Sequence, residues 1–235
     1  MRHILKLKAL LILCFALLLF AACKSQAPSN GNASAGADGK GSNVKSGDAT
    51  ADTGSSISPS DDPREALSKS MRALFAAKSF RARMEGSAAG RSITMLMEYV
   101  APDRYHMKSE MGEIIVVGSN AYQNMGGTWS KMPGDAGKLI SNFRDPKMLD
   151  EINKSANIKF VGTDTLDGKP MLVYQYTIDN FQGMPVKSTL KTWIGASDSL
   201  PYKVESEGEY NSMKSKTVGT YYDYGADISI EPPIQ

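Results

Sequence analysis

Cysteine and histidine are the side chains that most often carry out catalysis or bind metals, and this chain has two of each. Cys14, Cys23 and His3 all lie within the first 23 residues, so His106 is the only such residue in the body of the chain. Acidic residues are scattered along the chain, and no glycine-rich phosphate loop or metal-ligand spacing is present. We therefore predict no catalytic residue, no metal site and no cofactor. We interpret His106 as a surface residue on the polar face of a strand.

The first 22 residues have the order of a secretory signal peptide: basic residues, then an apolar run from Ala9 to Ala22. The run is shorter than the roughly 20 residues that a membrane span needs. The segment Leu19–Cys23 (LFAAC) resembles the lipobox of bacterial lipoproteins, although Phe20 stands where that motif usually has leucine. The resemblance implies cleavage before Cys23 and acylation of its thiol, which would anchor the chain in a membrane. The alternative is an ordinary secretory signal with a chance cysteine.

The formal net charge is +2, with 27 basic and 25 acidic residues. This balance does not provide the basic surface that nucleic-acid binding requires, so we predict no nucleic-acid partner. Lys24, not aspartate, follows Cys23, and this resembles the sorting signal of Gram-negative lipoproteins sent to the outer membrane. We expect a lipid-anchored protein of the cell envelope. In a Gram-negative host, it would sit on the outer membrane and face the periplasm.

Residues 23–61 are predicted to form a lipidated N-terminus and a flexible tether. This segment has no aromatic residue, and Val44 and Ile57 are its only branched aliphatic residues. It cannot bury enough apolar surface to offset the entropy lost on ordering. A coil of this length spans about 35 Å, so the tether lets the domain leave the membrane surface or simply spaces it from the membrane. Residues 62–235 have the length of one domain, which we expect to be monomeric.

The domain is predicted to begin with a helix, because Asp62 is a good N-cap and Pro63 suits the first helical position. After Lys78 the apolar residues alternate with polar ones, which is typical of strands with one wet face. Asp167-Gly168 predicts a tight hairpin turn. The predicted helix has an apolar stripe of Leu67, Met71, Leu74 and Phe75. The later strands are expected near residues 158–166, 171–178, 186–194, 202–207 and 215–224.

A second helical segment is predicted between about Ala136 and Ser155. Pro146 disfavours helix at the residue before it, so we expect a short helix, a corner and a second helix. The fold class is therefore α+β: about ten strands form one large antiparallel sheet, and two helical elements cover its apolar face.

Several short motifs occur in an order that indicates a family. A helix leads into residues 99–105 (YVAPDRY), and residues 127–129 (GTW), 193–195 (WIG), 200–203 (LPYK), 222–225 (YDYG) and 230–233 (IEPP) follow. This arrangement resembles the LolA/LolB-like superfamily of bacterial periplasmic lipoprotein and lipid carriers, with its mycobacterial glycolipid-binding relatives of the LppX/LprG type. The resemblance implies an unclosed β-barrel whose concave side is plugged by helices and keeps an apolar cavity for acyl chains.

The candidate cavity residues come from the alternation pattern together with this resemblance. Methionine is abundant, with 13 in the chain, and its flexible thioether suits ligands of variable shape, although it also fills irregular cores. The helical segment around Pro146 is either a movable lid over the cavity or a static cover. Trp129 and Trp193 either line the mouth of the cavity or belong to the core. A register error of one residue would exchange the two faces. The candidates are Met84, Ile93, Met95, Met97, Tyr99, Tyr105, Met107, Trp129, Leu139, Phe143, Leu149, Ile152 and Trp193, with Cys23 as the lipidation site.

Two functions are consistent with the sequence. The first is a membrane-anchored protein that binds or transfers a lipid or the acyl chain of a lipoprotein, without catalysis. The second is an envelope-stress sensor or regulator that binds a protein partner through the same fold.

Overall fold

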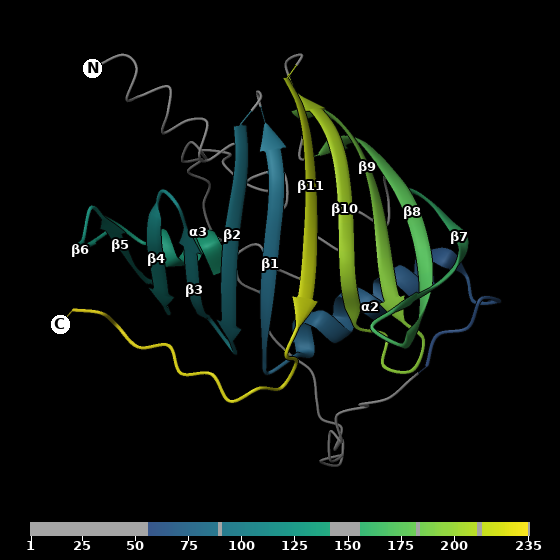
Figure 1. Ribbon diagram of the computed structural model, residues 1–235, viewed down its shortest axis with the longest axis horizontal. Coiled ribbons are helices and arrows are strands. Elements are labelled where there is room, and N and C mark those ends of the chain that lie inside the picture. The colour runs from purple at the N-terminus through teal and green to yellow at the C-terminus, as the bar shows by residue number, and fades with distance from the viewer. Residues whose placement is uncertain (1–55, 89–90, 142–155, 182–183, 211–212, 235) are drawn as a thin grey trace, which may run out of the picture.

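The computed structural model describes residues 56–234, except 89–90, 142–155, 182–183 and 211–212 (Figure 1). Within these residues one large sheet carries two helices on one of its faces. The described residues include no helix long and apolar enough to cross a membrane. The elements are α2 (Pro63–Ala76), β1 (Ser79–Ala88), β2 (Arg91–Val100), β3 (Arg104–Ser109), β4 (Gly112–Val117), β5 (Asn120–Met125), β6 (Thr128–Lys131), α3 (Ala136–Ser141), β7 (Asn157–Leu166), β8 (Lys169–Phe181), β9 (Met184–Gly195), β10 (Pro201–Tyr210) and β11 (Met213–Tyr222).

Helix α2 begins as its sequence predicts. The carboxylate of Asp62 accepts hydrogen bonds from the backbone N–H groups of Arg64 and Glu65, at 2.8 and 3.2 Å, and Pro63 occupies the first turn. Leu67 and Leu74 are buried, as the predicted stripe requires, whereas Met71 and Phe75 are half-buried.

The sheet has eleven antiparallel strands in the order β6-β5-β4-β3-β2-β1-β11-β10-β9-β8-β7. Chain neighbours pair as hairpins, and β1 pairs with β11 to join the two halves. The strands β6 and β7 form the two edges and do not pair with each other, so the curved sheet stays open (Figure 1). This confirms the predicted fold class, with one strand more than the expected ten. The turn at Asp167-Gly168 has positive φ at both residues, as its hairpin type requires.

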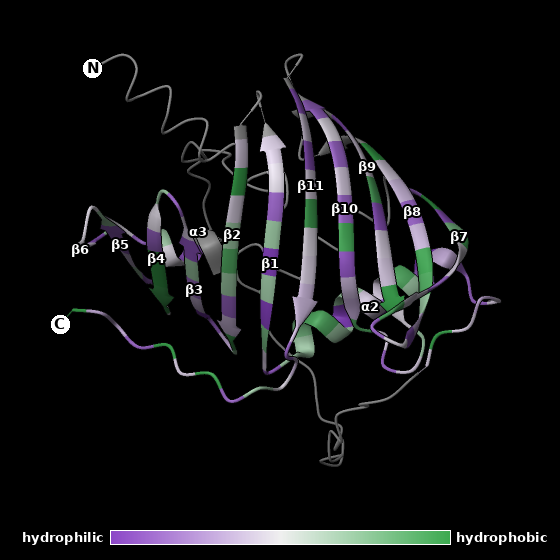
Figure 2. Cartoon of the chain, viewed as in Figure 1, coloured by the Kyte–Doolittle hydropathy of each residue, from purple (hydrophilic) through white to green (hydrophobic). Residues whose placement is uncertain are grey.

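Apolar and polar residues alternate along the strands, so the sheet has two different faces (Figure 2). We call the face packed against α2 and α3 the inner face. It carries two clusters of buried side chains. The β8 cluster joins Leu67 of α2 to Tyr174 and Ile194, and the β2 cluster joins Leu74 to Phe80 and the methionines of β1–β3. Helix α2 therefore connects both clusters.

The folded unit includes residues that composition assigned to the tether. Ile57 is buried in the β8 cluster, and its N–H donates to the carbonyl of Ala196 at 3.1 Å. Ile57 therefore packs with the domain, although it lies five residues before the predicted start at residue 62. The second half of the predicted helical segment, with Pro146, lies outside the described residues, whereas its first turn is present as α3.

Candidate functional site

The register of β1–β3 places most of the predicted cavity residues on the inner face. Met84 pairs with Met95, and Met97 pairs with Met107. Tyr99 pairs with Tyr105 on the same face, with ring centroids 5.1 Å apart. The buried members of this set belong to the β2 cluster, so they form a packed floor. Ile93 and Met95 are half-buried and lie at the end of the cluster nearest the β1–β2 hairpin. The buried members are Met84, Met97, Tyr99, Tyr105 and Met107.

Small side chains separate the two apolar clusters on the inner face. In one row across the sheet, Gly86 of β1 pairs with Thr217 of β11, which pairs with Ser206 of β10. Ile93 continues this row on one side and Leu190 on the other, and both are half-buried. We call this set the small-residue strip: Gly86, Ser188, Ser206, Gly208, Ser215, Thr217 and Gly219.

The strip residues have short side chains, so they extend less from the sheet than the larger side chains around them. A Cβ added to Gly219 would meet its nearest atoms at 3.7 and 3.9 Å, which is ordinary contact, whereas a Cβ added to Gly86 would lie 3.1 Å from the carbonyl oxygen of Lys216, which is tight. The strip residues are too small or too polar to register in a hydrophobic pattern, so the sequence interpretation missed them. One feature of the sequence indicates the strip. Every second residue of β11 is small, at positions where an inward-facing strand residue is expected to be bulky: Ser215, Thr217 and Gly219.

The two predicted tryptophans lie on the outer face. Trp129 pairs with Asn124, whose neighbour in β4 is the outward-facing Glu113. Trp193 is buried in a separate outer cluster with Met171 and Val173. Neither belongs to the inner face, because each is one residue out of phase with the inward-facing positions. Among the remaining candidates Leu139 lies in α3, and Phe143, Leu149 and Ile152 lie outside the described residues.

Trp193 is held in place by polar neighbours. Its Nε1–H donates to Asp164 at 2.7 Å, and this hydrogen bond is the main reason that the pKa of Asp164 is lowered. The ammonium groups of Lys191 and Lys203 lie 4.6 and 4.4 Å from its ring centroid. These cation–π contacts cover the ring from solvent, so Trp193 is a structural residue of the outer face.

Three buried hydroxyl groups lack hydrogen-bond partners among the described residues, and two of them lie where α2 packs against the sheet. Ser70 of α2 is fully buried, and its Oγ is one of them; Tyr174 Oη, on the inner face of β8, is the other. Burial also raises the pKa of Tyr174. A buried unsatisfied hydroxyl costs about 1–3 kcal/mol. The contact between α2 and the sheet is therefore less stable than its apolar area suggests.

We predict that Ser70→Ala raises the free energy of unfolding by about 1 kcal/mol. The substitution removes the unsatisfied hydroxyl and favours the helix. Ser68→Ala is the matched control in the same helix, because Ser68 Oγ donates to the carbonyl of Arg64 at 2.8 Å. Urea unfolding of both variants measures the difference. A loss of stability in Ser70→Ala would mean that its hydroxyl makes a hydrogen bond in solution.

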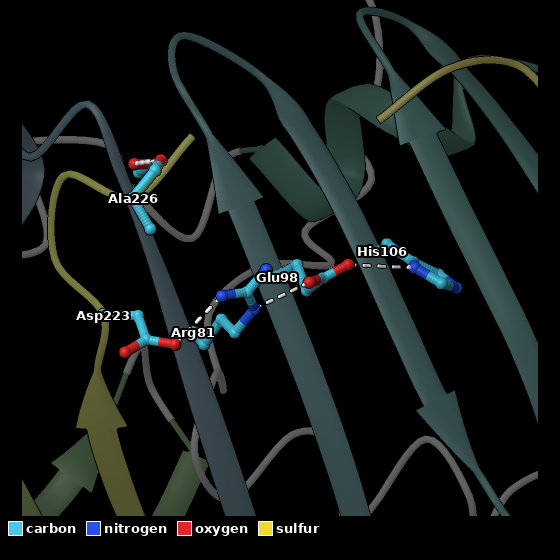
Figure 3. A network of polar contacts seen from close by, with 6 residues as sticks. Arg81, Glu98, His106, Asp223 and Ala226 are labelled. Carbon is cyan, nitrogen blue, oxygen red and sulfur yellow. Dashed lines mark hydrogen bonds and ion pairs between the residues drawn. The ribbon is translucent and has the colours of Figure 1, made fainter. Parts of the chain in front are cut away.

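A polar network crosses the outer face from Asp223, just after β11, through β1 and β2 to His106 of β3 (Figure 3). From His106 it continues to Glu113 of β4. Arg81 donates to Asp223 at 2.9 Å and to Glu98 at 2.8 Å. His106 lies between two carboxylates, with Nδ1 3.3 Å from Glu98 and Nε2 3.1 Å from Glu113. A neutral imidazole carries one N–H and can donate to only one of them. His106 is on the polar face, as predicted, and it joins three strands there.

The network makes the fold sensitive to acid. Burial raises the pKa of Glu98, but hydrogen bonds from Arg81 and His106 outweigh it, so the pKa lies below its ordinary 4.5. The hydrogen bond from His106 is the largest influence on Glu113, and it also lowers that pKa. The stabilisation that ionised Glu98 and Glu113 give to the folded state is therefore complete above pH 4.5. It is lost as the pH falls through their lowered pKa values.

We predict that Glu98→Gln lowers the free energy of unfolding at pH 7 by about 1 kcal/mol and reduces its decrease in acid. Thermal unfolding between about pH 7 and about pH 3 measures both effects. Glu85→Gln is the control, since Glu85 forms an exposed ion pair with Arg83, and such pairs contribute little. Equal acid sensitivity of the wild-type and Glu98→Gln proteins would contradict the assignment.

The two faces of the sheet carry different kinds of side chains. Among them, no group of three His, Cys, Asp or Glu residues is arranged to hold a metal ion. His106 is engaged by carboxylates at both ring nitrogens on the outer face. The inner face instead presents apolar side chains beside a strip of small ones, and this surface suits the binding of an apolar group.

No protein-family model matches the chain, and no curated protein matches it. Its fold is similar to that of the Mycobacterium tuberculosis lipoprotein LppX, with a TM-score of 0.55 and 14% identity over 73% of this chain and 100% of that chain. LprF from Mycobacterium bovis gives a TM-score of 0.53 and 17% identity over 77% and 100%. These likenesses confirm the predicted LolA-like/LppX fold.

The fold also occurs in a complex between two proteins. The structure of the Pseudomonas aeruginosa MucA/MucB complex matches with a TM-score of 0.50 and 16% identity, over 72% of this chain and 59% of that chain. This chain therefore spans less than two thirds of that protein. One fold is thus used by a lipoprotein and by a protein that binds another protein.

Proposed function

We propose that this protein is a membrane-anchored lipoprotein of the cell envelope that binds the acyl chain of a lipid or lipoprotein on its inner face, without catalysis. One observation carries the proposal: half-buried Ile93, Met95 and Leu190 flank a strip of small residues, on the apolar face of an open sheet. The LppX-like fold supports it. Acylation of Cys23 would supply the anchor.

Burial of apolar surface would supply the binding free energy. At about 25 cal/mol per Å², burying roughly 300 Å² of an acyl chain contributes about 7 kcal/mol before the costs of binding are subtracted. An affinity of this order protects the chain from water and still permits release. Methionine side chains beside the strip can adjust to chains of different shape.

Native mass spectrometry of the protein purified from a bacterial envelope in mild detergent tests the proposal. We expect near-stoichiometric lipid in excess of the covalent acyl groups, which extraction then identifies. A protein that stays free of lipid, even after incubation with envelope lipids, would contradict the proposal.

A second candidate function is regulation through a protein partner, as suggested by the fold shared with the MucA/MucB complex. This role predicts specific capture of a membrane or anti-sigma partner by the tethered protein, with the inner face filled by its own side chains. Affinity capture after crosslinking in cells distinguishes the two functions when it is combined with the lipid measurement.

A further inference from the structure

The small-residue strip brings hydroxyl groups onto the otherwise apolar inner face. One row crosses the centre of the sheet from β9 to β2 (Figure 1). Its register is Leu190↔Ser206, Ser206↔Thr217, Thr217↔Gly86 and Gly86↔Ile93. The two ends of the row are four strand spacings apart, roughly 19 Å at about 4.8 Å each. The row therefore has an apolar side chain at each end, and two hydroxyl groups and a glycine between them.

The hydroxyl group of Thr217 is available to a ligand. Thr217 is half-buried, so its side chain keeps contact with solvent at the inner face. The side chain lies against Gly86, since a Cβ added to that glycine would be 3.2 Å from Thr217 Oγ1 and 3.4 Å from Cγ2. Among the described residues, none forms a hydrogen bond with Thr217 Oγ1. Its O–H group can therefore donate to an acceptor that lies on the strip.

The second hydroxyl group of the row, that of Ser206, already has a partner within the protein. Ser206 Oγ lies 3.3 Å from Ser188 Oγ, and either atom can be the donor. Ser188 Oγ also makes a long hydrogen bond of 3.5 Å to the carbonyl oxygen of Glu207. When Ser188 donates to that carbonyl, Ser206 donates to Ser188. Thr217 is then the donor of this row that is left for a ligand.

A plain hydrocarbon chain matches the row poorly. Methylene groups laid over Thr217 would separate its hydroxyl group from water without replacing the lost hydrogen bond, and this lowers affinity. An ester group at the same place offers a carbonyl oxygen, which accepts that hydrogen bond. The alkyl segments on the two sides of the ester would then contact Ile93 and Met95 at one end of the row and Leu190 at the other.

We propose that the ligand is an ester-linked lipid whose ester group lies on the small-residue strip, where Thr217 Oγ1–H donates a hydrogen bond to the ester carbonyl. Thr217 is thus a specificity-determining residue, and it distinguishes esters from lipids that lack a carbonyl group. The inference rests on the proposed function, because it identifies the polar part of the lipid that the inner face binds.

Two matched lipids test the proposal. Dipalmitoyl phosphatidylglycerol has ester linkages, and its dihexadecyl ether analogue has chains of the same length but no carbonyl group. The full-length protein is purified in mild detergent, and an excess of an equimolar mixture of the two replaces the lipid that it carries. Native mass spectrometry separates the two complexes by mass and gives the ratio of diester to diether bound.

Three variants make the comparison specific to the hydroxyl group. Thr217→Val keeps the branched shape of the side chain and removes the hydroxyl, whereas Thr217→Ser keeps the hydroxyl. Thr220→Val makes the same change as the first variant at an exposed position of β11 on the outer face. Thermal unfolding of each variant checks that it is folded before the lipids are added.

We expect the wild-type protein, Thr217→Ser and Thr220→Val to prefer the diester by about 2- to 10-fold, which corresponds to one hydrogen bond. Thr217→Val should bind the two lipids equally. A ratio near one in the wild-type protein, or an unchanged ratio in Thr217→Val, would overturn the ester assignment and leave the proposed function standing, since lipid is bound in both cases. Binding of neither lipid to the wild-type protein would overturn both.

Discussion

Thr217→Trp is expected to weaken ligand binding by about 60-fold while the protein stays folded. Thr217 lies in the middle of the small-residue strip, between Gly86 and Ser206, and it is half-buried. An indole there would take the space of several methylene groups. Excluding about three methylenes at about 0.8 kcal/mol each costs about 2.4 kcal/mol, which is an affinity loss of about 60-fold.

Thr220→Trp is the matched control for this experiment. It makes the same change three residues later in β11, at an exposed position on the outer face between Arg83 and Lys203. Tryptophan is tolerated in strands, so we expect both variants to unfold cooperatively. Native mass spectrometry should find lipid on Thr220→Trp and little on Thr217→Trp. Undiminished lipid on Thr217→Trp would place the ligand elsewhere.

Leu67→Ala is expected to have the largest effect on stability, a loss of about 2–5 kcal/mol in the free energy of unfolding. Leu67 is 2% exposed and fixes α2 to the β8 cluster. Losing that contact also loosens the connection that α2 makes to the β2 cluster through Leu74. The melting temperature should fall by roughly 4–20 °C.

Arg72→Ala serves as its control, because Arg72 is exposed on the same helix. We expect a change within about 0.5 kcal/mol. Calorimetry of both variants makes the comparison. A similar small change in both would mean that α2 contributes little to the fold, and that it is not the element joining the two clusters.

The sequence predicted the fold where local signals were strong. Asp62 and Pro63 located the start of α2, and the alternation around Met95 and Met97 identified the inner face of β2 in the correct register. The motif order predicted the fold family. These signals succeed because caps and two-residue periodicity depend on neighbouring residues alone.

Other parts of the site depend on contacts that the sequence does not show. Trp129 and Trp193 are aromatic, but each is one position out of phase with the inward residues, and lysines cover Trp193 from outside. The small-residue strip is formed only by the pairing of β1, β11, β10 and β9, since no single strand distinguishes its glycines and serines from loop residues. Ile57 is buried because it packs in the β8 cluster, and its N–H donates to Ala196, which is distant in the sequence.

The central claim is that an acyl chain lies on the inner face, and photolabelling tests it most directly. A fatty acid carrying a diazirine would be bound, irradiated and located by peptide mass spectrometry. We predict adducts on the inward-facing residues Met95 and Leu190, which flank the strip. Their chain neighbours Leu96 and Thr189 face outward and should carry none. Adducts on the outward residues, or on both faces equally, would contradict the claim.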